Sequence, residues 1–107
     1  MRRRHKARRW ALQILYAWES RNRDQNLRET ARDFFDRRRV ADETREFGQQ
    51  LIDAVDDHLD EIDEHLRTAA RNWEFERLSV LDRNVLRIAL AEFLYFDEIP
   101  TKVSIDE

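Results

Sequence analysis

Glycine and proline, the residues that most often interrupt helices and form tight turns, occur only once each in this chain, at Gly48 and Pro100. The sequence therefore lacks most of the turn signals that β-hairpins need. Helical periodicity fills most of the 107 residues instead, and that length is enough for one domain with one core. The sequence predicts a single all-α domain, folded as a helical bundle.

Apolar residues recur at three- and four-residue intervals along most of the chain. The first set predicts a helix from about residue 5 to residue 20, and the second a shorter helix over residues 27–38. The third set, residues 47–69, fits either one long helix or two helices joined near residues 57 and 58.

A last helix is expected to begin at Ser79, which forms a capping pair with Asp82, and to end near Tyr95. Residues 72–78 before it are expected to be irregular. Its apolar residues wrap more than one face, so it is predicted to be the central and most buried helix.

Residues 1–9 form a basic arm that carries six cationic side chains and no acid. The whole chain has a net charge of −3, so the rest of it carries −9 once these six positive charges are set aside. A basic segment on an acidic body is typical of a protein that binds a polyanion, although a solvated terminus is the alternative. Single-stranded RNA fits, because cations follow its phosphates while aromatic side chains stack on its bases.

Two aromatic residues of the first predicted helix, Trp10 and Tyr16, have two possible roles. Each is either a core residue or a contact residue, in which case Trp10 is expected to contact RNA and Tyr16 a protein partner. Residues 37–39, three consecutive arginines, either complement the dipole at the end of the second helix or form an auxiliary RNA contact.

The sequence contains few of the residue patterns that catalysis or metal binding would need. The chain has no cysteine and no glycine-rich phosphate loop, and His58 and His65 are seven residues apart, too far for an ordinary metal pair on one helix. A solvated acidic face explains these histidines better. No apolar run is long enough to cross a bilayer. We therefore expect a cytoplasmic protein that needs no cofactor or metal, does not enter a membrane and is not an enzyme.

Three blocks of the sequence resemble the NusB family of transcription antitermination factors. They are residues 4–8 (RHKAR) with 11–18 (ALQILYAW), residues 81–92 (LDRNVLRIALAE) and residues 99–107 (IPTKVSIDE), while residues 47–63 fit the middle of the same pattern. The family usually has asparagine at the position of Asp106. The resemblance covers essentially the whole chain. It implies two packed helical subdomains: residues 1–40 with the basic arm, and residues 41–107 as an incomplete C-terminal subdomain.

The resemblance also implies a function. NusB-like proteins bind the boxA element of ribosomal RNA leader transcripts together with NusE, a small ribosomal subunit protein. The pair joins the elongating RNA polymerase complex and suppresses premature termination. By position, the resemblance assigns RNA contacts to Arg4, His5, Lys6 and Arg8, with Arg2 and Arg3 as a less aligned extension. It assigns partner contacts to Tyr16 and Asp82.

NusB-like chains continue for about two further helices, so these last two helices are expected to be missing here. Residues 104–107 match the capping-box pattern S-x-x-E, which normally starts a helix, yet no helix follows in this sequence. This pattern also predicts that C-terminal helices are missing. Without these two helices to cover the last predicted helix, an exposed apolar groove is predicted around Leu86, Leu90 and Phe93.

Two other functions remain open at this point. A NusB-like domain also forms the N-terminal part of certain ribosomal RNA cytosine methyltransferases. A purely protein-binding helical adaptor, whose arginines face an acidic partner, is the second alternative.

Overall fold

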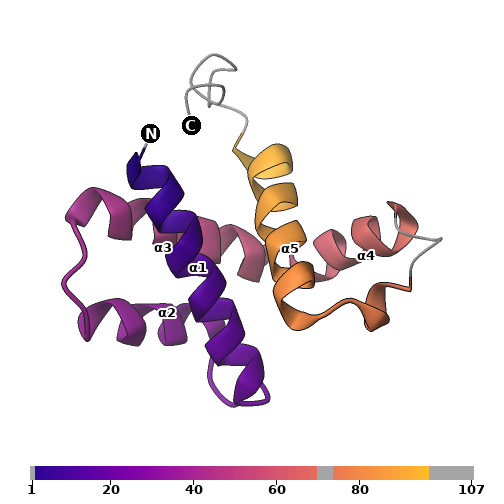
Figure 1. Cartoon of the computed structure of the whole chain (residues 1–107), viewed down its shortest axis with the longest axis horizontal. Coiled ribbons are helices and arrows are strands. Elements are labelled where there is room, and N and C mark those ends of the chain that lie inside the picture. The colour runs from indigo at the N-terminus through magenta and orange to yellow at the C-terminus, as the bar shows by residue number, and fades with distance from the viewer. Residues whose placement is uncertain (1, 70–73, 97–107) are drawn as a thin grey trace.

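All regular structure in the described part of the chain is helical, as predicted (Figure 1). The computed structural model describes residues 2–69 and 74–96, with side chains from residue 4 onward. The elements are α1 (Arg2–Ser20), α2 (Leu27–Asp36), α3 (Asp42–Asp57), α4 (Leu59–Ala69), a 3₁₀ turn at Phe75–Arg77, and α5 (Val80–Tyr95).

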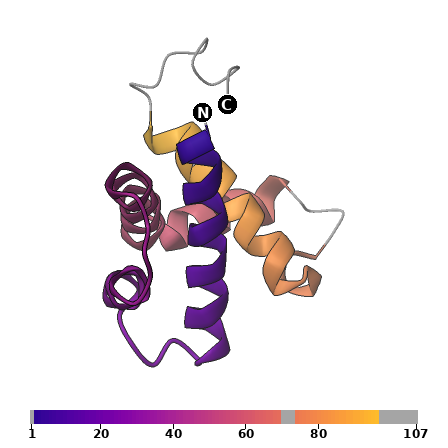
Figure 2. The ribbon, with the colours of Figure 1, turned by 60° about the vertical axis from the view of Figure 1, so that its left-hand side comes forward.

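Helices α1 and α3 form the centre of the bundle. Helix α1 packs against α2, α3 and α5, helix α3 packs against α1, α2, α4 and α5, and α4 packs against α3 and α5 (Figures 1 and 2). The side chains of Ala7, Ala11, Ile14 and Leu15 are fully buried on one face of α1, in keeping with their three- and four-residue spacing. This face contributes much of the apolar core.

The prediction that α5 is the most buried helix is wrong. Its buried residues are Asn84, Arg87, Ile88 and Ala91, while four of its large apolar side chains are exposed: Leu81, Val85, Leu86 and Phe93. The apolar pattern of a helix shows how much surface it can bury, but its neighbours decide how much is covered. Of the residues predicted to form an exposed groove, Leu86 and Phe93 are exposed, whereas Leu90 is half-buried against the core.

The predicted helix boundaries are close to those observed. The first helix begins at Arg2 instead of residue 5, and the second ends at Asp36 instead of residue 38. The third periodic stretch is two helices, separated at His58. The Ser79 hydroxyl accepts a hydrogen bond of 3.0 Å from the backbone N–H of Asp82, which confirms the predicted start of α5. The 3₁₀ turn lies in the stretch predicted to be irregular, and the capping box at residues 104–107 falls outside the described residues.

Gly48 lies where three helices approach one another closely. A Cβ atom built on this residue of α3 would lie 2.9 Å from the Phe35 ring of α2 and 3.8 Å from the Ala7 carbonyl oxygen of α1. Because Phe35 is itself buried, the ring has little room to retreat. A glycine inside α3 therefore allows α1 and α2 to share one core with it.

Candidate nucleic-acid and partner interface

Residues 2–9 of the basic arm form the first two turns of α1, where their positive charges oppose the helix dipole. No acid occurs in the first turn of this helix. The N-terminus of a helix carries a partial positive charge, so cations there reduce helix stability and anions increase it. The arrangement concentrates positive potential at one end of α1 and suits an external polyanion better than it suits the isolated helix.

Two of the predicted RNA-contact residues are directed toward the protein. The Arg8 guanidinium donates two hydrogen bonds to the Glu92 carboxylate of α5, at 2.6 and 2.8 Å. Arg4 is half-buried, and its guanidinium lies 5.0 Å from the centre of the Phe47 ring. Both side chains therefore contribute to packing between α1 and the helices next to it.

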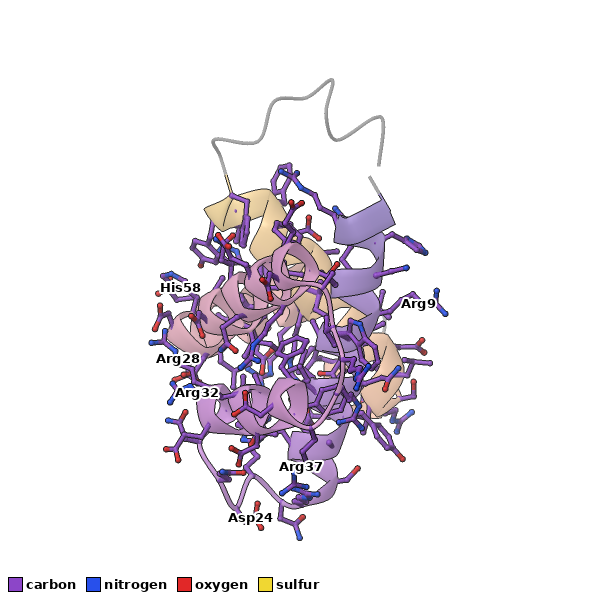
Figure 3. The ribbon with its side chains drawn as sticks, turned by 90° about the vertical axis from the view of Figure 1, so that its left-hand side faces the viewer. Arg9, Asp24, Arg28, Arg32, Arg37 and His58 are labelled. Atoms are coloured by element: carbon purple, nitrogen blue, oxygen red, sulfur yellow. The ribbon has the colours of Figure 1, made fainter. Side chains whose placement is uncertain are left out.

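Other residues of the predicted RNA-contact set face solvent. His5 and Lys6 are exposed, and so is Arg9, which the sequence analysis did not select. Figure 3 shows Arg9 extending away from α1. The side chains of Arg2 and Arg3 lie outside the described residues, although their backbone is helical.

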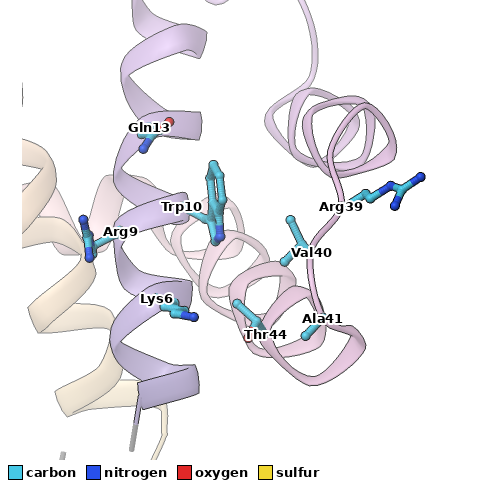
Figure 4. A pocket seen from close by; sticks show the side chains of 8 residues that line it. All are labelled: Lys6, Arg9, Trp10, Gln13, Arg39, Val40, Ala41 and Thr44. Atoms are coloured by element: carbon cyan, nitrogen blue, oxygen red, sulfur yellow. The ribbon is translucent and has the colours of Figure 1, made fainter.

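Trp10 stands in a cavity of about 350 Å³ between α1 and the segment that connects α2 to α3. We call this the Trp10 cavity, and its lining residues are Lys6, Arg9, Trp10 and Gln13 from α1, Arg39, Val40 and Ala41 from the connecting segment, and Thr44 from α3 (Figure 4). Phe34 supports the Trp10 ring edge-on, with ring centres 5.6 Å apart. Trp10 is thus partly packed and partly accessible.

The three arginines of the second basic cluster, residues 37–39, lie in different surroundings. Arg38 donates a hydrogen bond of 3.1 Å to the Phe34 carbonyl in the last turn of α2 and covers the Phe34 ring, as expected for a cation at a helix C-terminus. Arg39 instead lines the Trp10 cavity. Arg37 is exposed.

A second cavity, of about 510 Å³, follows on the same side of α1. We call it the Tyr16 cavity. Five of its lining residues are apolar or aromatic (Leu12, Tyr16, Ala17, Phe34 and Leu81), and Arg9 and Gln13 complete it. Tyr16 and Leu81 are 58% and 57% exposed, which is unusual for large side chains and marks a candidate protein contact. Asp82, the other predicted partner residue, is exposed and follows Leu81 in the first turn of α5.

The two cavities are neighbours, because Arg9 and Gln13 line both. One carries cations around an aromatic ring, and the other is mostly apolar with an acid beside it. Lys6, Arg9, Trp10 and Gln13 recur at helical spacing, so a helical projection of the arm would have selected Arg9. No sequence pattern predicted that Val40 and Thr44 lie near Trp10, because only the tertiary fold brings them there.

A buried cluster of charges holds α1, α4 and α5 together behind this surface. The Arg87 guanidinium donates hydrogen bonds of 2.8 and 2.9 Å to the Asp63 carboxylate, and it also bonds Glu19 and Asn84. Burial acts to lower the pKa of Arg87, but the hydrogen bond to Asp63 and the charges of Asp63 and Glu19 outweigh it, so the pKa is raised. This guanidinium remains charged and structural.

Among the described residues, no group of three or more histidines and acids is placed to hold a metal ion. The His58 ring stacks on Tyr95, with ring centres 3.8 Å apart, and both approach Glu61. Loss of hydration, and then the charge of Glu61, raise the pKa of Tyr95. These contacts join α4 to the end of α5. No helix in the described part of the chain has the length and apolar character to span a membrane.

Known proteins resemble this chain in sequence and in fold. A family model described as the NusB family matches residues 5–107. The chain belongs to the NusB family. It is 42% identical over 106 residues to the transcription antitermination protein NusB of Thermobifida fusca, covering 97% of this chain and 70% of that protein. It is 38% identical over 105 residues to NusB of Chloroherpeton thalassium, covering 97% of this chain and 49% of that protein.

The NusB fold is also shared with solved structures. The structure of T. maritima NusB superposes with a TM-score of 0.80 at 32% identity, covering 96% of this chain and 71% of that one. A second similar chain comes from the crystal structure of a plectonemic RNA supercoil, with a TM-score of 0.81, 26% identity, and coverage of 98% and 74%. The chain therefore spans about half the length of the Chloroherpeton relative and about seven tenths of the others described here.

Proposed function

We propose that this NusB-family chain is a non-catalytic, cytoplasmic RNA-binding factor that acts in transcription antitermination. It binds boxA RNA of ribosomal RNA leader transcripts together with NusE and enters the elongating RNA polymerase complex with that partner. The observation that carries the proposal is the pair of adjacent cavities along α1. The cationic, aromatic Trp10 cavity suits single-stranded RNA, and the apolar Tyr16 cavity suits a protein.

Further support comes from the relatives and from the distribution of charge. The relatives described above are named antitermination proteins, and one similar chain comes from a crystal structure of RNA. The basic arm lies on a body whose remaining charge is negative, which favours polyanion binding near that end of α1. These observations favour antitermination over a methyltransferase domain.

The test is a fluorescence anisotropy titration of the chain against boxA-like single-stranded RNA and a scrambled RNA of the same composition. It is carried out at two salt concentrations, with and without NusE. A preference for the boxA-like RNA that strengthens with NusE is the expected result. Equal, salt-sensitive binding to both RNAs would reduce the site to a general basic arm. Tight NusE binding without RNA preference would instead favour a protein adaptor.

A further inference from the structure

We infer that the Trp10 cavity holds one unstacked nucleobase of the bound RNA, an inference that rests on the proposed RNA-binding function. The base lies against the accessible part of the Trp10 ring. Its flanking phosphate lies near Lys6 and Arg39, which approach the cavity from different elements of the fold.

The size and walls of the cavity suit a flat, partly apolar group. Its volume of about 350 Å³ falls within the range of small-molecule sites, roughly 300–1,000 Å³. Trp10 and Val40 face each other across it (Figure 4). Because Phe34 and the Arg38 guanidinium lie 5.6 and 5.9 Å from the Trp10 ring centre, the indole is supported before any base arrives. A supported aromatic ring loses little entropy when a base stacks on it.

The charge of the cavity suits a nucleotide. Three of its eight described lining residues are cations and none is an acid, although the chain contains 23 aspartates and glutamates. In Figure 4 the Arg39 guanidinium points away from Trp10, so this arginine supplies charge at the outer rim. Gln13, which is exposed, adds groups that can donate and accept hydrogen bonds at a base edge. A phosphate alone would not require the apolar walls.

The test combines an abasic scan of the RNA with substitutions in the cavity, in the presence of NusE. Each nucleotide of the boxA-like RNA is replaced in turn by an abasic one. Removing one particular base is expected to weaken binding to the wild-type chain about fivefold or more, the loss typical of one stacked base. Binding to Trp10→Ala should be weaker overall and should no longer respond to that base. Additive effects of the two changes at every position would overturn the inference.

Two further variants guard against misfolding of Trp10→Ala. Val40→Phe fills the cavity without changing charge, so it should lower affinity while leaving the salt dependence unchanged. Arg39→Gln should reduce the slope of log affinity against log salt by about 0.7, the contribution of one phosphate contact. Arg37→Gln is its matched control, because Arg37 is exposed and does not line the cavity.

These outcomes separate the inference from the proposed function. Wild-type preference for boxA-like RNA, with Val40→Phe neutral and Arg39→Gln no different from Arg37→Gln, would remove the nucleobase site and leave the function standing. RNA affinity that falls with Arg39→Gln but with no abasic substitution would indicate a phosphate contact only. That result would also overturn the inference. A wild-type chain without boxA preference would overturn both.

Discussion

Arg8 and Glu92 are joined by two hydrogen bonds that tie the basic arm to α5 across 84 positions of sequence. The side chains of this pair are only 27% and 17% exposed, so its loss leaves a poorly hydrated carboxylate. We expect Arg8→Gln to lower the free energy of unfolding by about 1–3 kcal/mol, measured by urea denaturation.

Lys6→Gln is the matched comparison within the same arm, because Lys6 is exposed. It should change stability by less than about 0.5 kcal/mol. If about four phosphates are neutralised in the complex, the salt slope for RNA binding is about −2.8, and Lys6→Gln should bring it to about −2.1. A similar change of slope in Arg8→Gln, without loss of stability, would assign Arg8 to the RNA instead.

Tyr16 gives a prediction for the protein partner. Because this side chain is 58% exposed, Tyr16→Ala should leave the unfolding transition within about 0.5 kcal/mol of wild type. Binding to NusE should weaken by about 2 kcal/mol or more, as expected for a tyrosine anchor at an interface. Calorimetric titration measures this, with Ser20→Ala, exposed on the same helix, as the control. Equal affinity of both variants for NusE would exclude the Tyr16 cavity as the partner site.

The buried pair Arg87 and Asp63 predicts non-additive effects on stability. Arg87→Met leaves two acids, Asp63 and Glu19, without their main partner and should cost about 3–5 kcal/mol. The double variant Arg87→Met with Asp63→Asn removes one of these orphaned charges and should recover part of that loss. Chemical denaturation of the single and double variants measures the coupling, and a fully additive result would contradict it.

Gly48→Ala tests the close approach of α3 to α1 and α2. Alanine raises intrinsic helix stability by about 0.8–1.0 kcal/mol, but its methyl group would lie 2.9 Å from the Phe35 ring, and overpacking typically costs about 1–3 kcal/mol. We expect net destabilisation of about 1 kcal/mol. Combining it with Phe35→Leu should remove most of the effect of the alanine. A stabilised single variant would show that the helices can move apart at no cost.

The dependence of folding stability on pH in acid should reveal the contribution of the exposed ion pair between Arg67 and Glu76. A side-chain hydrogen bond from Arg67 lowers the pKa of Glu76 below its usual value of 4.5. A carboxylate whose pKa is depressed on folding stabilises the folded state above its unfolded pKa and loses this contribution as the pH falls through the folded pKa. The stability difference between wild type and Arg67→Gln should therefore be present at pH 6 and shrink as the pH falls below 4.5 and through the folded pKa of Glu76. A difference that does not shrink in acid would contradict this assignment.

Helical periodicity predicted the all-α fold because its evidence is local: apolar spacing, the cap at Ser79, and the near absence of glycine and proline. It could not predict that α1 and α3 form the centre and that α5 is partly uncovered, because coverage depends on which helices pack together. Whether an arginine of the arm faces Glu92 or solvent is likewise decided by the direction of α1 against α5. The Trp10 cavity could not be predicted either, because it depends on the backbone path of residues 39–41, and no periodic pattern describes that path.

Because Arg9 and Gln13 line both cavities, the two proposed ligands would meet at the same two side chains. Whichever of the two bound first would restrict the rotamers of Arg9, and the second would then find part of that conformational entropy already lost. Such an arrangement would make the two proposed binding events cooperative without any rearrangement of the helices. By thermodynamic linkage, RNA would then raise the affinity for the protein partner by the same factor as the partner raises the affinity for RNA.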